Sequence, residues 1–288
     1  MKELVVSSPA KVNLHLQVLG SRPDGYHRIE TIFLGVPLED RLRVSIEGEG
    51  LLLVSSHPQV PSGPSNTVAK AIRVLAGRVG RLPGIRVEIE KGIPPGGGLG
   101  GGSSNAAAVL VAVNELLGLG LSREELMDVG RKVGADVPFF LLGSSAAVGR
   151  ERGDALEPIK SALRGYLLLV FPPLSVSTSW AYSSLSFPLT PPCTDINILA
   201  LLLERGDLAG LASRVFNHLE GPVFAKYALL ARIKGGLLER GASLALMSGS
   251  GSTLFGIFGE GESANEAARW ASGMGWGVCL VPLGGVGV

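Results

Sequence analysis

A glycine-rich stretch from residue 94 constrains this chain more than any other feature of its sequence. It reads PPGGGLGGGSSNAA, follows the alternating segment IRVEIE, and continues into a run with the composition of a good helix. Glycines let a backbone take positive φ angles and approach a ligand closely, and the free N–H groups that begin a helix attract anions. Six glycines in seven positions exceed what an ordinary turn needs. The stretch predicts a phosphate-binding loop before a helix that is capped by Ser103, Ser104 or Asn105.

Three well-known nucleotide motifs can be compared with this loop. Gly96, Gly98 and Gly101 have the GxGxxG spacing of dinucleotide-binding folds. However, the strand before them alternates, and no second strand ends in an acidic residue at the expected distance. A P-loop needs a lysine that this stretch lacks, and a protein-kinase glycine loop continues into a strand. The sequence therefore disfavours a dehydrogenase, a P-loop enzyme and a protein kinase.

Length and charge limit the remaining possibilities. A chain of 288 residues favours two packed domains, and 26 basic against 25 acidic residues give no broad field that would attract nucleic acid or an anionic membrane. No apolar run reaches the ~20 residues that cross a bilayer, and Cys193 and Cys279 are too few for a disulfide framework. We expect a soluble, cytoplasmic protein that binds neither nucleic acid nor membrane; the sequence makes no prediction of its oligomeric state.

Hydrophobic periodicity places strands and helices on both sides of the loop. Residues 12–18 alternate, which indicates a strand with one buried face and a polar face that displays Lys11 and Asn13. Other strands are expected near 42–46, 85–89, 166–171, 243–247, 252–258 and 277–282. Other helices are expected near 65–79, 195–204, 207–217, 221–240 and 262–274.

Two helix starts and one domain boundary can be placed more closely. Ser122 and Glu125 have the spacing of a capping box, which begins a helix that runs to about residue 133. Asp136 precedes a short apolar helix that has a proline in its first turn. The polar stretch 149–159 is rich in turn-forming residues, so we expect an N-terminal domain of residues 1–152 and a C-terminal domain of residues 153–288.

Three ordered motifs resemble those of the GHMP kinases, a superfamily of small-molecule kinases. They are PAKVNLHL at 9–16, the loop PPGGGLGGGSSNAA at 94–107 and MSGSGSTLFGIF at 247–258. RPDGYH at 22–27 and GADVPFF at 134–140 are similar to the branch that acts on 4-diphosphocytidyl-2-C-methyl-D-erythritol. The resemblance implies a two-domain α+β fold, with an S5-like N-terminal domain and a ferredoxin-like C-terminal domain.

The same resemblance implies a reaction. The γ-phosphate of ATP, with Mg²⁺, would be transferred to the 2-hydroxyl of that substrate in a non-mevalonate isoprenoid precursor pathway. Asp136 would be the base, and Lys11 would stabilise charge on the transferring phosphoryl group. From local pattern alone, Asp136 is explained equally well as a helix N-cap, and Lys11 has the weaker alternative of an exposed strand lysine. No acidic magnesium ligand stands out at a family position.

The glycine loop and one asparagine are the ATP contacts that the resemblance implies. Asn66 resembles the family's adenine contact, although it is an equally good cap for the helix that follows it. Ser104 is expected either to bind phosphate or magnesium or to cap its helix. The expected ATP-binding residues are Asn66, Pro94, Pro95, Gly96, Gly97, Gly98, Leu99, Gly100, Gly101, Gly102, Ser103 and Ser104.

The substrate contacts are expected from the first motif, the loop after it and one aromatic residue of the second half. They are Asn13, Tyr26, His27 and Tyr182. Tyr26 would stack on cytosine and His27 would read its polar edge, with Trp180 or Tyr182 as the opposite wall. The third motif, Ser248 to Thr253, is expected to close over the substrate and phosphate region, or else to be a plain hairpin turn.

Two other functions compete with this interpretation. A GHMP kinase that acts on mevalonate, homoserine or a sugar is the first, and the RPDGYH segment argues against it. A catalytically silent ligand-binding relative is the second. The presence of both Lys11 and Asp136 argues against that alternative.

Overall fold

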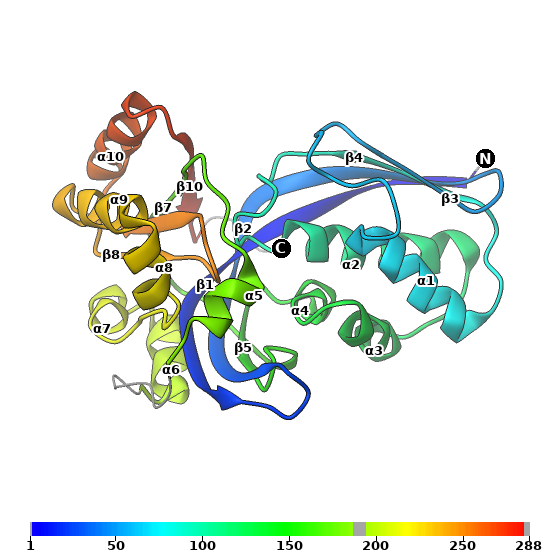
Figure 1. The fold of residues 1–288 in the computed structure, drawn as a ribbon, viewed down its shortest axis with the longest axis horizontal. Coiled ribbons are helices and arrows are strands. Elements are labelled where there is room, and N and C mark those ends of the chain that lie inside the picture. The colour runs from blue at the N-terminus through cyan, green and yellow to red at the C-terminus, as the bar shows by residue number, and fades with distance from the viewer. Residues whose placement is uncertain (1, 187–193, 285–288) are drawn as a thin grey trace. The chain divides into compact units, whose positions relative to one another are not determined.

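The computed structural model describes residues 2–186 and 194–284. The chain divides into two compact units (Figure 1). Unit 1 consists of Met1–Lys11, Val36–Pro95 and Gly100–Gly143, and unit 2 of Val12–Gly35, Gly96–Leu99 and Ser144–Val288. The units interleave along the chain, so two long strands and the glycine loop each belong partly to both. The single boundary expected after residue 152 stays a prediction.

Within the described residues, runs of strands and runs of helices follow one another along the chain. The strands are β1 (Lys2–Ser21), β2 (His27–Ile46), β3 (Leu51–Ser55), β4 (Ile85–Glu90), β5 (Ala146–Arg150), β6 (Ala155–Ile159), β7 (Gly165–Phe171), β8 (Leu244–Met247), β9 (Leu254–Phe258) and β10 (Gly277–Leu283). The helices are α1 (Thr67–Val79), α2 (Gly101–Leu117), α3 (Arg123–Val133), α4 (Val137–Leu142), α5 (Thr178–Ser183), α6 (Ile196–Arg205), α7 (Leu208–Ala212), α8 (Glu220–Lys226), α9 (Ala228–Glu239) and α10 (Gly261–Gly273).

Unit 1 pairs its strands with a layer of helices. The second half of β2 is antiparallel to β4, and β3 is parallel to β4 on its other side. Alternate residues of β2 and β4, such as Leu42 and Val87, are fully buried, as the period of two predicted. Helices α1 and α2 pack side by side, and α2 and α3 both contact α4 (Figure 1). The glycine loop therefore leads from a sheet strand into a helix that is packed on both flanks.

Strand β1 departs from the prediction of a single buried face. Residues 10–18 are buried without interruption, and Lys11 and Asn13 are each only 3% exposed. Periodicity reports which side chains are polar, but it does not report what covers them. Here the polar side chains have polar partners, because Lys11 pairs with Asp136 and the Asn13 amide donates to Thr31. The predicted exposed polar face is therefore wrong.

One predicted helix start is confirmed and another is wrong. The hydroxyl of Ser122 accepts the Glu125 N–H at 3.2 Å, and the Glu125 carboxylate accepts the Ser122 N–H at 3.0 Å, which completes the predicted capping box. Helix α2, by contrast, begins at Gly101 and not at a cap within Ser103–Asn105. Gly100 takes the cap position with φ 72° and no side-chain hydrogen bond. Glycine makes this early entry possible because a left-handed residue costs it little.

Unit 2 contains an antiparallel sheet in the order β10-β7-β9-β8. The predicted strand at 166–171 is its second member, β7. Helices α9 and α10 pack on this sheet, and their buried residues join those of the sheet in one apolar core (Figure 1). The first half of β2 also lies in this unit, where it is antiparallel to β5, which in turn pairs with β6.

Two predicted helices of unit 2 are shorter than expected. The helix expected over 207–217 ends at Ala212, because the residues after it form a parallel bridge between Leu16 and Asn217. The Leu16 N–H donates to the carbonyl of Phe216, and the His218 N–H donates to the carbonyl of Leu16. The helix expected over 221–240 is divided into α8 and α9 by a non-helical residue between them. Long-range pairing thus overrides the local helical pattern.

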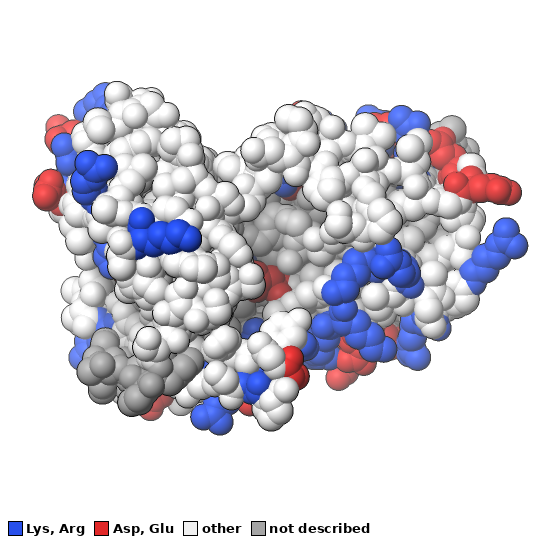
Figure 2. All heavy atoms as spheres, viewed as in Figure 1, with Lys and Arg blue, Asp and Glu red and all other residues white. Residues whose placement is uncertain are grey.

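The surface carries both signs of charge. Figure 2 shows basic and acidic side chains on the same face, together with large uncharged areas, which agrees with the near balance of charges in the sequence. Among the described residues, no helix combines the length and the apolar character that a membrane span requires.

Candidate active site

The glycine loop takes left-handed backbone angles at alternate residues. Gly96, Gly98 and Gly100 have φ angles of 74°, 77° and 72°. Side chains with a Cβ disfavour this region, so glycine is required here for conformational reasons. The space around these three glycines is not the same. A Cβ added at Gly96 would come no closer than 3.6 Å to its nearest neighbour, Ser175 Oγ. The predicted positive φ angles are confirmed.

In unit 2, the tip of the loop is held by the third motif. The Ser248 hydroxyl donates to the carbonyl of Gly98 at 3.0 Å, and the Thr253 N–H donates to the carbonyl of Gly97 at 3.2 Å. A Cβ at Gly98 would lie 2.2 Å from the Ser248 carbonyl oxygen. The motif also joins the antiparallel strands β8 and β9, so it is a hairpin turn that contacts the glycine loop. Close packing is therefore a second reason, besides the positive φ angle, why Gly98 is a glycine.

The third motif is itself clamped by two residues that sequence reasoning missed. The Asn217 side-chain amide donates to the carbonyls of Met247 at 2.8 Å and Gly249 at 2.7 Å. Glu220 accepts the Met247 N–H at 2.8 Å and pairs with Lys234. Burial raises the pKa of Glu220, against the lowering effect of Lys234. Both residues lie in the segment FNHLEG, which has no local signature for such a role.

In unit 1, Lys11 and Asp136 form an ion pair. The lysine Nζ lies 3.4 Å from Asp136 Oδ2, with the lysine side chain 4% exposed and the aspartate side chain 34% exposed. A Cβ at Gly100 would lie 3.1 Å from Lys11 Cε and 2.9 Å from the ring of Phe140. The two predicted catalytic residues are therefore together, and Lys11 lies against Gly100, the residue at the cap position of α2.

The alternative explanation of Asp136 as a helix cap is not supported. Asp136 precedes α4 with φ −82° and ψ −16°, and its side chain makes no capping hydrogen bond. A capping residue instead has extended backbone angles and accepts an N–H from the first turn. The carboxylate faces Lys11, so its position is explained by the ion pair and not by the helix.

A buried polar cluster lies beneath the start of α2, and sequence reasoning did not anticipate it. It contains Ser8, Asp40, Lys91, Ser104 and Asn105. The Ser104 hydroxyl accepts from Ser8 at 2.7 Å and is almost fully buried. Ser104 is neither a cap nor an exposed residue, and its predicted contact with phosphate or magnesium stays a prediction. Asp40 stands between Glu39 and Arg41 in the sequence, so no local signal distinguishes it.

Asn66 is the N-cap of α1. Its side chain accepts the Val68 N–H at 2.8 Å and donates to the carbonyl of Pro61 at 2.7 Å. This confirms the structural alternative that its local pattern allowed. The adenine contact implied by family resemblance stays a prediction.

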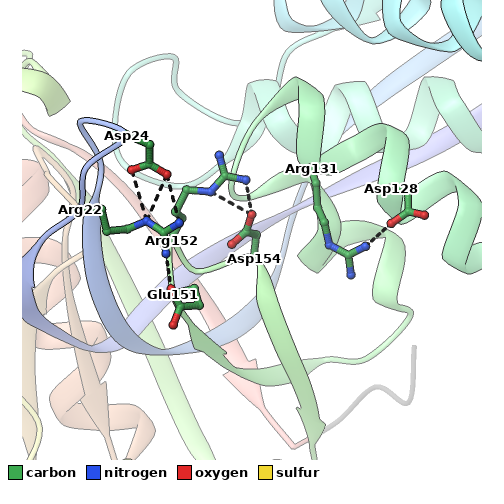
Figure 3. A network of polar contacts seen from close by, with 7 residues as sticks. All are labelled: Arg22, Asp24, Asp128, Arg131, Glu151, Arg152 and Asp154. Atoms are coloured by element: carbon green, nitrogen blue, oxygen red, sulfur yellow. Dashed lines mark hydrogen bonds and ion pairs between the residues drawn. The ribbon is translucent and has the colours of Figure 1, made fainter.

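The loop that carries Tyr26 is braced by ion pairs in unit 2. Figure 3 shows Arg22 bonded to Asp24 and Glu151, and Arg152 bonded to Asp154; the Arg131–Asp128 pair drawn there belongs to α3. The hydrogen bond from Arg22 lowers the pKa of Asp24 below its usual value. Asp24 also accepts the Tyr26 N–H at 3.1 Å.

The Tyr26 ring itself is partly covered. It is 53% exposed, and the Arg152 guanidinium carbon lies 5.0 Å from the ring centre. A cation over an aromatic face is attracted to the ring quadrupole and limits how the ring can turn. Tyr26 is therefore an exposed aromatic residue with an anchored orientation.

His27 and Tyr182, two of the predicted substrate contacts, lie beside each other. Their ring centres are 5.1 Å apart with 32° between the planes. Trp180 instead packs edge-on against Tyr227 at 5.9 Å and lies under the ammonium group of Lys226. Of the two predicted candidates, Tyr182 is thus the one beside His27.

Asn13, the remaining predicted substrate contact, donates its backbone N–H to Ser248 Oγ at 3.4 Å.

Comparison with known proteins decides the family. Residues 66–144 match the profile described as GHMP kinases N terminal domain, and residues 198–274 match GHMP kinases C terminal. The chain is 41% identical over 279 residues to the 4-diphosphocytidyl-2-C-methyl-D-erythritol kinase of Citrifermentans bemidjiense, which covers 96% of this chain and 97% of that relative. It is 42% identical over 272 residues to the kinase of that name from Syntrophotalea carbinolica, with 93% and 95% covered.

This chain belongs to the GHMP kinases. Within that superfamily it belongs to the family of those two relatives. A crystal structure of a 4-(cytidine 5'-diphospho)-2C-methyl-D-erythritol kinase superposes with a TM-score of 0.81 and 35% identity, over 98% of this chain and 100% of that one. The homoserine kinase of Cytophaga hutchinsonii superposes with a TM-score of 0.71 over 98% and 94%, at 19% identity, which shows a shared fold alone. The predicted α+β class and GHMP fold are confirmed.

As a GHMP kinase, the protein uses ATP to phosphorylate an alcohol. Mg²⁺ commonly accompanies ATP and takes most of its ligands from phosphate oxygens and water, so it needs few protein groups. Among the described residues, no three His, Cys, Asp or Glu side chains gather in a way that could hold a metal ion. The roles of the individual residues stay predictions.

Proposed function

We propose that this GHMP kinase transfers the γ-phosphate of ATP to the 2-hydroxyl of 4-diphosphocytidyl-2-C-methyl-D-erythritol, a step of non-mevalonate isoprenoid precursor synthesis. The observation that carries the proposal is the 41% identity, across nearly the whole of both chains, to a relative that bears this activity in its name. The pairing of His27 with Tyr182 supports it, because a base-binding site needs flat aromatic surfaces.

Lys11 and Asp136 are the proposed chemical groups. Phosphoryl transfer requires an aligned hydroxyl, help with its proton, and compensation for negative charge on the phosphoryl oxygens. Asp136 is partly exposed and makes no capping bond, so its carboxylate is available to accept the proton of the acceptor hydroxyl. Lys11 is buried beside it and supplies a fixed positive charge for the transferring group.

The glycine loop is the proposed nucleotide-binding element. Its left-handed glycines and the N-terminus of the 17-residue helix α2 present backbone N–H groups, which suits the phosphates of ATP. Mg²⁺, where it is bound with ATP, would neutralise negative charge on the phosphates. Asn66 is included as the proposed adenine contact, in addition to its capping role.

The cytidine end of the substrate is assigned to Tyr26, His27 and Tyr182. Tyr26 presents an exposed ring with an anchored orientation, and His27 with Tyr182 presents a second aromatic surface. A pyrimidine stacked on such a ring gains about 1–3 kcal/mol per base–aromatic contact. Asn13 is proposed to contact the sugar-derived part of the substrate.

The proposal is tested by measuring ADP release with three acceptors at equal concentration: 4-diphosphocytidyl-2-C-methyl-D-erythritol, mevalonate and homoserine. Turnover with the first alone is expected. Phosphorus NMR of the product should show one new phosphomonoester signal and an intact diphosphate. Turnover with mevalonate or homoserine at a similar kcat/KM would instead assign the chain to another GHMP activity, and binding without turnover of any acceptor would make it a silent relative.

A further inference from the structure

Asp40 is a buried carboxyl group at which both ends of the glycine loop meet. It lies in β2, is 1% exposed, and accepts the backbone N–H groups of Gly92 at 2.9 Å and Ile93 at 2.8 Å. These two residues come directly before the loop. The side-chain amide of Asn105, in the second turn of α2 and therefore after the loop, donates to the same carboxyl group at 2.8 Å.

Lys91 completes the set of donors around Asp40. The two form an ion pair whose side chains are almost fully buried. A buried ion pair is weak evidence for a stabilising role, because the cost of desolvation offsets much of the attraction. A buried carboxylate whose acceptor sites are filled by donors from separate segments does fix the geometry of those segments. Asp40 therefore determines where the segment before the loop and helix α2 lie relative to each other.

The same segments are also in close van der Waals contact. A Cβ at Gly92 would lie 2.2 Å from the carbonyl oxygen of Glu39. A Cβ at Gly101, the first residue of α2, would lie 3.1 Å from Ile93 Cγ2 and 3.3 Å from Lys91 Nζ. The base of the loop is thus closed by direct packing as well as by hydrogen bonds.

The orientation of the Asn105 amide is fixed from two sides. One contact of its nitrogen is Asp40, and the other is the Ser8 hydroxyl at 2.9 Å. Ser8 in turn donates to the Ser104 hydroxyl at 2.7 Å. An amide nitrogen has two hydrogens, so this arrangement uses both and leaves no alternative rotation of equal quality. The first two turns of α2 are therefore held through two adjacent side chains.

We propose that Asp40 and Asn105 are positioning residues for nucleotide binding, which close the base of the glycine loop and set the direction of the first N–H groups of α2. The inference rests on the proposed function, in which that loop binds the phosphates of ATP. Donors that are aligned before a ligand arrives bind it more tightly than donors that must first be ordered. Neither side chain has to touch the nucleotide in order to raise its affinity.

An exchange of the two side chains tests this role. In Asp40→Asn, the backbone N–H groups of Gly92 and Ile93 hold the amide oxygen, so the amide nitrogen faces the Asn105 nitrogen and donor meets donor. Asn105→Asp places two carboxylates opposite each other. Each single change therefore removes the bond. The combined Asp40→Asn/Asn105→Asp variant restores a donor opposite an acceptor. Each single variant should raise the Kd of a non-hydrolysable ATP analogue by about 10-fold, in line with the cost of a small displacement of aligned groups. The combined variant should recover to within about 3-fold of the native Kd.

Asn114→Asp is the matched control, because it makes the same change at the other end of α2. There the Asn114 side chain bonds the backbone of Leu121, away from the glycine loop, so the analogue should bind with the native Kd. The KM of the acceptor substrate should stay unchanged in all variants. A purely structural role would lower the Tm of the single variants and leave their analogue Kd unchanged, and that result overturns the inference.

The outcomes separate this inference from the proposed function. Native protein that binds the analogue, with equal Kd in every variant, overturns the positioning role alone. Native protein that does not bind the analogue overturns the proposed nucleotide loop and the inference with it. Should the single variants fail to fold, the combined variant decides: a native Kd supports the positioning role, and a folded protein with weak binding contradicts it.

Discussion

Lys11 and Asp136 form an asymmetric pair: the lysine is buried, whereas the aspartate 3.4 Å away is one-third open to solvent. A buried ammonium group is held in place by its surroundings, and a partly exposed carboxylate can be reached by a hydroxyl group. The two members of the pair are therefore suited to different tasks.

Asp136→Asn should lower kcat by at least about 100-fold, which is the usual effect of losing a positioned base, with little change in ATP affinity. Asparagine is as good an N-cap as aspartate, so a residue needed only for capping would tolerate this change. Steady-state kinetics with both substrates varied measures the effect. A kcat within 3-fold of the native value, in a folded variant, would remove Asp136 from the mechanism.

The companion variant is Lys11→Met, which keeps the length and loses the charge. The kcat should fall by a similar factor because charge on the transferring phosphoryl group is no longer offset. The remaining Asp136 side chain is one-third exposed to solvent, so the Tm should change by only a few degrees. A large loss of Tm with an unchanged kcat per folded molecule would instead assign Lys11 to stability.

Two glycines of the loop should respond differently to alanine. Gly98→Ala should destabilise the fold by about 2–4 kcal/mol, because its Cβ would meet the Ser248 carbonyl oxygen and overpacking and left-handed strain add together. Gly96→Ala would bring its Cβ only into ordinary contact with Ser175 Oγ and should cost only about 1 kcal/mol of strain. It should nevertheless weaken ATP-analogue binding by about 10-fold, because a methyl group interferes with close approach to phosphate. Calorimetry and titration distinguish the two; equal loss of stability in both variants would contradict the distinction.

The two aromatic residues of α5 provide a matched pair for the cytidine site. Tyr182→Ala should raise the KM of the cytidyl substrate by about 10-fold, equivalent to about 1.4 kcal/mol, with the KM of ATP nearly unchanged. Trp180→Ala removes a larger ring from the same helix, but that ring packs on Tyr227 and not on His27. It should leave the cytidyl KM within 2-fold of native. The reverse ranking would place the base-binding wall at Trp180.

His15 should make the fold sensitive to mild acid. Burial, together with the nearby His218, lowers the pKa of His15 to about 4, from an ordinary value of 6.5. Between these values the unfolded chain binds a proton that the folded protein does not, so the free energy of unfolding falls as pH drops from about 6.5 to about 4. The loss should approach roughly 3 kcal/mol at the lower end.

Urea denaturation at a series of pH values measures this dependence. His15→Asn keeps an acceptor near the position of Nδ1, which accepts the Phe216 N–H at 3.4 Å. Its unfolding free energy should depend less on pH over that window. An unaltered slope in the variant would show that other groups cause the acid sensitivity.

The sequence by itself determined the features that depend on neighbouring residues. The positive φ angles of the glycine loop, the capping box at Ser122 and the cap at Asn66 are all set within a few residues of chain. Glycine in the left-handed region and a side-chain oxygen near a free N–H are local preferences, and they persist in the folded protein. The ordered motifs also indicated the correct superfamily.

Tertiary structure decided everything that depends on residues distant along the chain. The partner of Asp136 is Lys11, and the clamp on the third motif comes from Asn217. Asp40 bonds to two segments that each lie more than fifty residues from it along the chain. Local polarity patterns hold no information about which distant group will cover a side chain. For that reason the alternation of residues in β1 correctly predicted a strand, but the prediction that its polar face is exposed was wrong.

The start of α2 shows the same difference between local preference and tertiary structure within a single helix. Serine and asparagine at 103–105 have good capping preference, and local reasoning placed the helix start there. In the fold, those residues are drawn into the helix, and Ser104 and Asn105 bond to Ser8 and Asp40. Hydrogen bonds to buried partners outweigh a capping preference that water could also satisfy, so only the folded structure reveals why these polar residues are present.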